Sequence, residues 1–297
     1  WTDIAQSFVM IIAMCLMVFF GIKELGGISN FLNSLQNISP NYMKWFPSSN
    51  FSDYLFAPFL FIMGWIFSGI GVIGQPHVMI RFMAINNTDN IPQTRIYYYG
   101  WYISFYTLTI CAAFIARLLI PEINNLDPEL ALPILATKLL PDFLVGVVLA
   151  GIFAAAMSTA DSQILSCTAS ITNDLFSNKK DNYLFNKAVT LIVTLFVVTI
   201  AINDNKNVFN LVLISWSTLA CCFSPILIVY SLKQKITQFL SIMMMVIPLI
   251  TLHLWRYFEL NILIYEVAPG ILSGIITFLV HKFYTKFLLK RLKKNYL

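Results

Sequence analysis

The chain has 297 residues, of which 58% are hydrophobic and 11% charged, with a formal net charge of +5. A soluble domain carries roughly a quarter charged residues, so this composition, with its mean hydropathy of +0.75, excludes water as the main solvent. Backbone polar groups in lipid must be satisfied within each segment, which predicts an all-α polytopic membrane protein. The five cysteines lie in apolar runs without a CxxC pair or a histidine cluster. The sequence therefore indicates neither a disulfide framework nor a zinc site.

Windows of about 20 apolar residues predict eight transmembrane helices. In chain order they lie at about 4–22, 56–74, 100–118, 141–163, 186–203, 208–231, 237–255 and 263–281.

Eight spans place both termini on the same side of the membrane. If the C-terminus is cytoplasmic, 13 of the 19 Lys and Arg residues fall on that side and 6 on the other. This split follows the positive-inside rule, so we expect a cytoplasmic C-terminus in a multi-pass protein of the cytoplasmic membrane. The basic tail then acts as a topology anchor, or alternatively binds anionic lipid.

The carboxylates and the known motifs bear on enzymatic function. The chain contains no GxxxxGK[ST], HExxH or GxSxG motif, which disfavours an ATP-driven pump and a conventional hydrolase. Most carboxylates, including Glu266, are assigned to loops or to the membrane interface. Asp161 is predicted inside a span, although the polar residues after it suggest that its helix is already leaving the membrane. It is either a structural hydrogen-bond acceptor or part of an ion path.

A polar stripe interrupts the apolar segment FAAAMSTADSQILSCTASITNDL, residues 153–175. Ala155, Ser158, Thr159 and Ser162 follow helical spacing and therefore lie on one face. Hydroxyls among small residues suit a hard monovalent cation such as Na⁺, with a second, broken helix completing the oxygen shell. The alternative is helix packing, in which each hydroxyl bonds the carbonyl four residues earlier.

The segment FIMGWIFSGIGVIGQPHVMIRFMAI, residues 61–85, carries four glycines followed by Pro76. In a helix interior each Gly costs about 1 kcal/mol and Pro about 3 kcal/mol relative to Ala. We expect this span to break and expose backbone groups to a cavity, or else to be a kinked helix with glycines at helix contacts. In a later span Trp216 precedes Pro225, where it lines a substrate cavity or packs against a neighbouring helix.

In order along the chain, the runs WTDIAQSFVMI, MGW, GQPHVMIRFMA, GIFAAAMSTADSQILSCTASITNDL, LISWSTLACCFSP and YEVAPG resemble the sodium/solute symporters, most closely their sodium/proline branch. The resemblance covers the whole chain and implies the C-terminal part of an inverted-repeat transporter fold of the LeuT type. Residues 1–297 would hold the last helix of the first repeat, the second repeat and the C-terminal peripheral helices, with the first five helices absent. The opening on Trp1, without an initiator Met, a basic n-region or a cleavage site, fits a fragment without a signal peptide.

The resemblance also implies site residues. The sodium-binding positions are the Ala155 carbonyl and the hydroxyls of Ser158 and Thr159, and the other half of the site lies on a core helix that the sequence does not contain.

The substrate-binding positions implied by the resemblance fall on Ser68, Val72 and Pro76. The proline transporter has Trp and Tyr at the first two, and this departure leaves proline unsettled as the solute. A local gap in the alignment with that branch would instead place Trp65 on the face that contacts the substrate. Trp65, Asp161, Ser162 and Trp216 are the accessory positions.

These observations predict sodium-coupled symport of a small organic solute, such as proline or another amino acid, by alternating access. The alternatives are an inactive truncated remnant and a symporter-like membrane sensor domain. The expected partners are the solute, Na⁺ as coupling ion, the lipid bilayer and the missing N-terminal helices, with no nucleic acid, no enzymatic activity and no other cofactor.

Overall fold

The structure of the chain is a computed structural model that describes residues 2–39, 42–43, 56–120, 122, 127–179, 181–203 and 208–295, with no side-chain description for 203 and 288–295. Lys44, Lys180 and Lys206, which entered the charge count, lie outside these ranges, as do the side chains of Lys290, Arg291, Lys293 and Lys294 in the basic tail.

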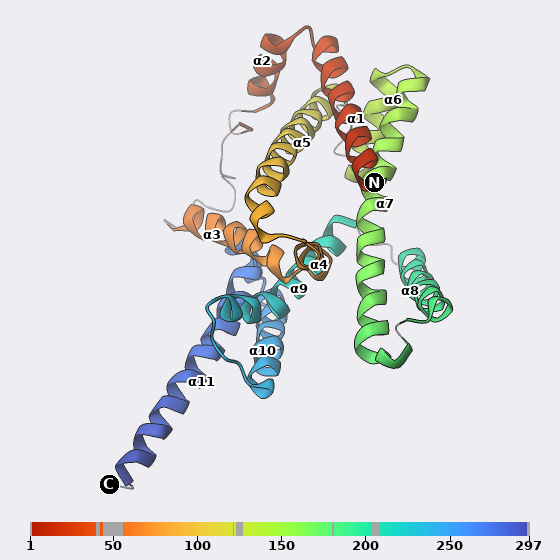
Figure 1. The fold of residues 1–297 in the computed structure, drawn as a ribbon. Helices are drawn as coiled ribbons and strands as arrows, with labels where there is room; N and C mark the ends of the chain where they lie inside the picture. Colours follow the sequence, from red (N-terminus) through yellow and green to blue (C-terminus); the bar gives the residue numbers. More distant parts are fainter. Residues whose placement is uncertain are drawn as a thin grey trace. The chain divides into compact units, whose positions relative to one another are not determined.

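Eight helices in the described ranges are long and apolar enough to cross a membrane, by length and composition. This confirms the predicted number and order of spans, and these ranges contain no strand. In Figure 1 they are α1 (Thr2–Glu24), α3 (Ala57–Ile70) with its extension to Gly74, α5 (Ile91–Leu119), α7 (Asp142–Ser170), α8 (Tyr183–Asn203), α9 (Val208–Ser231), α10 (Gln238–Tyr257) and α11 (Val267–Asn295).

Three of these helices extend well beyond the predicted spans. α5 begins at Ile91 rather than near residue 100, α7 continues past residue 163 to Ser170, and α11 continues past residue 281 to Asn295. The polar residues after Met157 do not stop α7, because hydroxyls among them bond carbonyls of their own helix, as when Ser162 Oγ donates to the Ser158 carbonyl at 2.9 Å. Asp161 therefore lies inside a continuous helix, and the expectation that this helix is leaving the membrane there stays a prediction.

The chain folds into two compact units that alternate along the sequence. Unit 1 comprises residues 1–45 and 85–201, and unit 2 comprises residues 46–84 and 202–297. Each unit is described by itself below.

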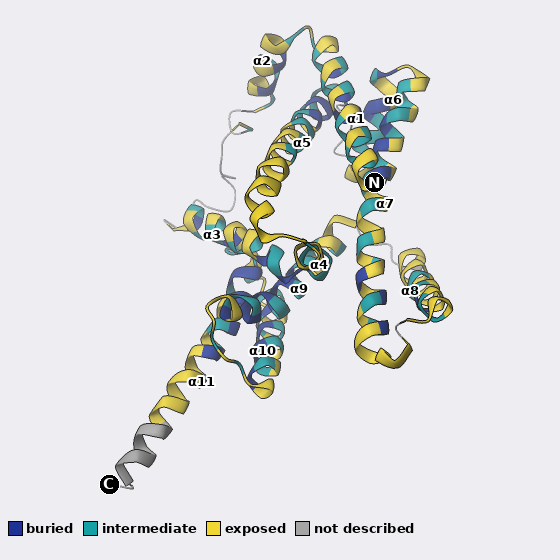
Figure 2. Ribbon diagram, in the orientation of Figure 1, coloured by how far each residue is buried: buried dark blue, intermediate teal, exposed yellow. Residues whose placement is uncertain are grey.

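Unit 1 also contains α8, but its core is built from α1, α5, α7 and two shorter helices, α2 (Ile28–Ile38) and α6 (Ala131–Leu139). The two shorter helices lie between predicted spans. Each of the five helices contributes a fully buried side chain to one apolar core: Met17, Leu35, Ile115, Leu135 and Val148. Buried residues are dark blue in Figure 2.

Glycine sets two features of unit 1. Gly26 has a φ of +79° at the end of α1, and the amide of the next residue, Gly27, donates to the Ile22 carbonyl at 2.9 Å. This left-handed termination turns the chain into α2. At Gly151 on α7 an added Cβ would lie 2.7 Å from Ala13 Cβ, so glycine permits the close packing of α7 on α1.

Unit 2 is organised by α9, α10 and α11, which share a small-residue contact. On α11 Gly270 and Gly274 form a GxxxG pattern. An added Cβ at Gly274 would lie 2.6 Å from the Cβ and Cγ of Pro225 on α9 and 3.0 Å from Cγ of Pro248 on α10, while one at Gly270 would collide with Cys221 Sγ. The missing side chains of the two glycines therefore allow three helices to meet at short range.

Candidate functional site

The polar stripe on α7 forms hydrogen bonds within its own helix. Thr159 Oγ1 donates to the Ala155 carbonyl at 3.1 Å, and Ser162 Oγ donates to the Ser158 carbonyl at 2.9 Å. These bonds are the pattern that helix packing predicts. They also place the Ala155 carbonyl and the Thr159 hydroxyl side by side, and a hydroxyl that donates its proton keeps its acceptor lone pairs. The stripe therefore retains oxygen atoms that could bind a cation.

The exposure of these side chains shows where such an ion could reach them. Ser158 and Ser162 are half-buried, whereas Thr159 and Asp161 are exposed. The Thr159 hydroxyl is accordingly open to a ligand or to a further helix. Among the residues that the structure describes, no group of three or more His, Cys, Asp or Glu side chains could hold a metal ion.

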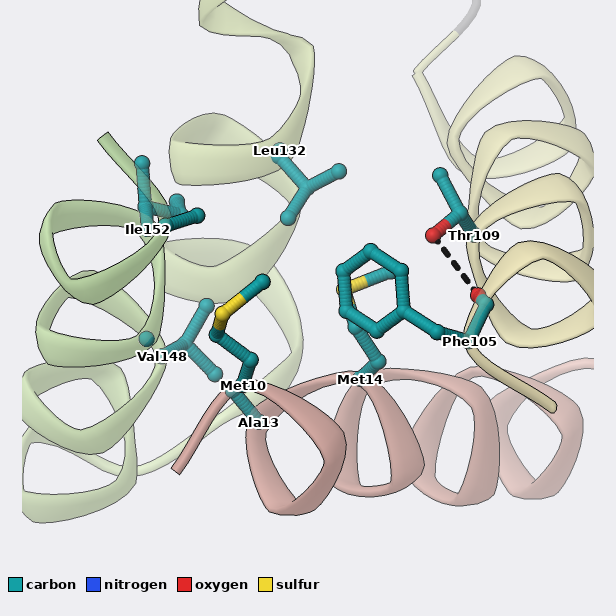
Figure 3. A pocket seen from close by; sticks show the side chains of 10 residues that line it. Met10, Ala13, Met14, Phe105, Thr109, Leu132, Val148 and Ile152 are labelled. Atoms are coloured by element: carbon teal, nitrogen blue, oxygen red, sulfur yellow. Dashed lines mark hydrogen bonds between the residues drawn. The ribbon is translucent and has the colours of Figure 1, made fainter. Parts of the chain in front are cut away.

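A cavity of about 180 Å³ lies between α1, α5, α6 and α7 and reaches Ala155. Figure 3 shows its lining, which is dominated by apolar side chains such as Met10, Met14 and Phe105. Thr109 also lines it, but its hydroxyl donates to the Phe105 carbonyl of the same helix at 2.9 Å. This lining suits an apolar group better than an ion, so the cavity does not extend the candidate cation site.

The expected break in the second span is present in unit 2. α3 ends at Ile70, a 3₁₀ turn covers Gly71–Gly74, and Gln75 is extended with φ −89° and ψ 110° before α4 (Pro76–Met83) begins. A proline disfavours helical backbone in the residue before it, and its fixed φ suits the first position of the new helix. Pro76 thus explains both the end of one helix and the start of the next.

Trp216 on α9 binds the broken span on both sides of the break. Its indole Nε1 donates to the Ser68 carbonyl at 3.3 Å, and its own carbonyl accepts from Gln75 Nε2 at 3.1 Å. Gln75 is only 1% exposed, so this amide contact is shielded from solvent. The polar end of the indole is therefore used in packing, as one of the two interpretations of Trp216 predicts.

The glycines of the broken span lie against the same helix. An added Cβ would lie 2.7 Å from Ala220 Cβ at Gly71 and 2.6 Å from Ser224 Oγ at Gly74. Ser224 Oγ also donates to the Gly71 carbonyl at 3.4 Å. The helix therefore breaks as one interpretation predicts, and Gly71 and Gly74 form close helix contacts as the other predicts. Exposure of the broken backbone to a cavity stays a prediction.

The predicted substrate positions lie along this one segment. Ser68 is in the last turn of α3, Val72 in the 3₁₀ turn and Pro76 at the first position of α4, and all three are half-buried. Trp65 is 47% exposed and stacks on Tyr265, with ring centroids 5.3 Å apart and planes at 15°. The structure brings Ser68 together with Trp216 in unit 2, and Ala155 together with Thr159 in unit 1.

One buried polar cluster was missed in the sequence. Glu266, assigned to a loop or the membrane interface, is only 3% exposed and pairs with Arg256. Glu266 does precede α11 in a turn, but that turn is covered by neighbouring helices, which position along the chain cannot show. The sequence feature that could have indicated this pair is a Glu directly before an apolar run, with an Arg ten positions upstream.

The sequence profile of the "Sodium:solute symporter family" matches residues 1–247 of the chain. No solved structure gives a significant match.

Several curated proteins are similar to the chain along most of its length. It is 28% identical to a sodium/proline symporter of Salmonella typhimurium over 291 residues. This alignment covers 92% of the present chain and 55% of the relative. The Escherichia coli sodium/proline symporter is 27% identical, covering 94% and 57%. Sodium/proline symporter 2 of Staphylococcus saprophyticus is 27% identical, covering 96% and 58%. The chain thus spans a little over half the length of these relatives.

Proposed function

Because the chain belongs to the sodium:solute symporter family, we propose that it forms part of a transporter coupling Na⁺ entry to the uptake of a small organic solute. The observation that carries the proposal is the apolar span that unwinds at Gly71–Gly74 and resumes at Pro76. Secondary transporters bind solutes and ions at such interrupted helices, where backbone groups leave the regular hydrogen-bond ladder. Relatives named for proline support an amino acid such as proline as the solute class.

In this proposal the two candidate sites have separate roles. The Ala155 carbonyl and the hydroxyls of Ser158 and Thr159 hold Na⁺, and the solute contacts Ser68, Val72 and Pro76. The remaining accessory positions are Trp65, Asp161, Ser162 and Trp216.

A single helix cannot enclose an ion, since its carbonyls are engaged with amides four residues on. The further ligands of Na⁺ come from helices corresponding to the part of the relatives that this chain does not span. Residues 1–297 then correspond to the last helix of the first repeat, the second repeat and the C-terminal peripheral helices of an inverted-repeat fold of the LeuT type.

Alternating access links the two sites. Na⁺ binding favours the outward-open arrangement and thereby solute binding, and both are released to the cytoplasm, where sodium is low. The membrane potential contributes about 2.3 kcal/mol per charge per 100 mV.

The test is sodium-dependent uptake by the native transporter reconstituted in proteoliposomes. Replacing Ser158 and Thr159 together by Ala removes two oxygen ligands, so the sodium concentration for half-maximal uptake should rise about tenfold or more, on the scale of one or two hydrogen bonds to a charged group. Thr107→Ala is the control, because the Thr107 hydroxyl makes the same kind of bond, to the Ile103 carbonyl at 2.8 Å, on α5.

An unchanged sodium dependence in the double variant would refute the assigned cation site. If the native protein shows no sodium-dependent uptake of proline, other amino acids or other small organic solutes, the chain is better explained as an inactive remnant than as part of a symporter.

A further inference from the structure

A buried polar cluster joins α9, α10 and the start of α11 without contributing to either candidate site. Arg256, near the end of α10, donates to Glu266 Oε1 through Nε at 3.1 Å and also through Nη2. The same Nη2 donates to Ser217 Oγ on α9 at 2.8 Å. Ser217 Oγ lies 3.1 Å from Glu266 Oε1 and 2.6 Å from the Leu213 carbonyl, either of which accepts its proton.

The three side chains of this cluster must keep a specific geometry, because Glu266 and Ser217 are buried. A buried carboxylate is tolerated when a well-placed cation and hydrogen bonds compensate for its lost hydration. Glu266 immediately precedes α11, where the helix dipole also favours a negative charge. Ser217 is completely buried, so its hydroxyl has protein groups as partners. Together these constraints fix the side of α9 that faces α10 and α11.

The turn that carries Glu266 also packs against α3. The ring of Tyr265 stacks on Trp65, and its hydroxyl donates to the Leu213 carbonyl at 3.4 Å. An added Cβ at Gly64 would lie 2.8 Å from the Tyr265 amide nitrogen. The turn therefore contacts α3 one helical turn before Ser68 and contacts α9 one turn before Ser217.

On α9, Ser217 directly follows Trp216, the residue that binds the broken span at Ser68 and Gln75. A rotation of α9 that released Ser217 from the cluster would also move the Trp216 carbonyl and indole away from their partners. The rotation of α9 thus controls both contacts at once.

We propose that Arg256, Glu266 and Ser217 are positioning residues, which fix the rotation of α9 and so hold the broken span, residues 68–76, in the shape that the solute meets. The part of this inference that concerns solute affinity rests on the proposed function. The part that concerns the broken span does not.

The first test is hydrogen exchange of the native protein in lipid nanodiscs, read by mass spectrometry. Ser217→Ala should speed amide exchange in residues 68–76 about tenfold or more, on the scale of one lost hydrogen bond to a charged group, and leave α10 unchanged. Thr218→Val is the matched control, because the neighbouring Thr218 hydroxyl donates to the Ile214 carbonyl of its own helix at 2.7 Å. Unchanged exchange in 68–76, or a uniform increase through α9, α10 and α11, would overturn the inference.

The second test is uptake by the same variants. Ser217→Ala should raise the KM for the solute about fivefold or more, with the maximal rate and the sodium dependence within twofold of the unmodified protein. Arg256→Lys, which keeps the charge but loses the planar fork of donors, should give the same kind of change. An unaltered KM in both variants, in a preparation whose unmodified protein transports, refutes the role in solute affinity. Failure of the unmodified protein to transport counts against the proposed function, and the exchange experiment then decides the positioning role.

Discussion

Replacing Gly274 by Ala should force apart the contact between α9, α10 and α11. The new Cβ would lie 2.6 Å from the Cβ and Cγ of Pro225, which is 0.8 Å shorter than the 3.4 Å at which ordinary van der Waals contact begins. It would also lie 3.0 Å from Cγ of Pro248. Both neighbours are proline rings, which cannot rotate away as a flexible side chain does, so the helix backbones must separate.

The magnitude follows from two opposing effects. Overpacking a close contact costs about 1–3 kcal/mol, whereas Ala gains about 1 kcal/mol over Gly in helix propensity. Gly100→Ala on α5 provides the matched control, because nothing lies within 4 Å of the Cβ it would add. Both variants gain the propensity term, so the difference between their free energies of unfolding isolates the overpacking cost of about 1–3 kcal/mol.

The assay is equilibrium unfolding of the purified protein in mixed micelles with increasing SDS, followed by circular dichroism. We expect Gly274→Ala to unfold at a lower SDS fraction than the unmodified protein and Gly100→Ala at an equal or higher one. Equal shifts in the same direction for both variants would show that α11 does not pack against Pro225 and Pro248 at the described distance.

The remaining predictions concern a histidine and the orientation of the chain. Burial, and secondly the charge of Arg81, lower the pKa of His77 below its usual 6.5. Neutral imidazole is therefore favoured in the folded protein, and stability should fall as the pH drops from 6.5 through the lowered pKa. In a ¹⁵N-histidine NMR titration, Arg81→Gln should move the midpoint part of the way back towards 6.5, since burial remains, and a midpoint at or above 6.5 in the unmodified protein would contradict this account. The excess of Lys and Arg assigned to one side predicts a cytoplasmic C-terminus. A tag placed there should be labelled only after the membrane of intact cells is permeabilised, and labelling of sealed cells would reverse the proposed orientation.

Local patterns in the sequence predicted much of the fold. The eight spans follow from runs of apolar residues long enough to cross a bilayer, and the break follows from Pro76, which constrains the backbone of Gln75 directly. The stripe on α7 likewise depends on helical spacing alone. α5, α7 and α11 extend well beyond their predicted spans. In α7 the polar residues do not end the helix, because hydroxyls such as that of Ser162 bond its own carbonyls.

Features that join distant parts of the chain appeared only in the tertiary structure. Gln75 and Trp216 are 141 positions apart and nevertheless share a hydrogen bond. Glu266 looks like an ordinary loop carboxylate until α9 and α10 cover it and supply Ser217 and Arg256. The sequence by itself determined which segments are helical and where one of them breaks, because those properties depend on neighbours within a few residues. The tertiary structure decided which polar groups are buried and paired, because burial depends on helices that meet only when the chain has folded.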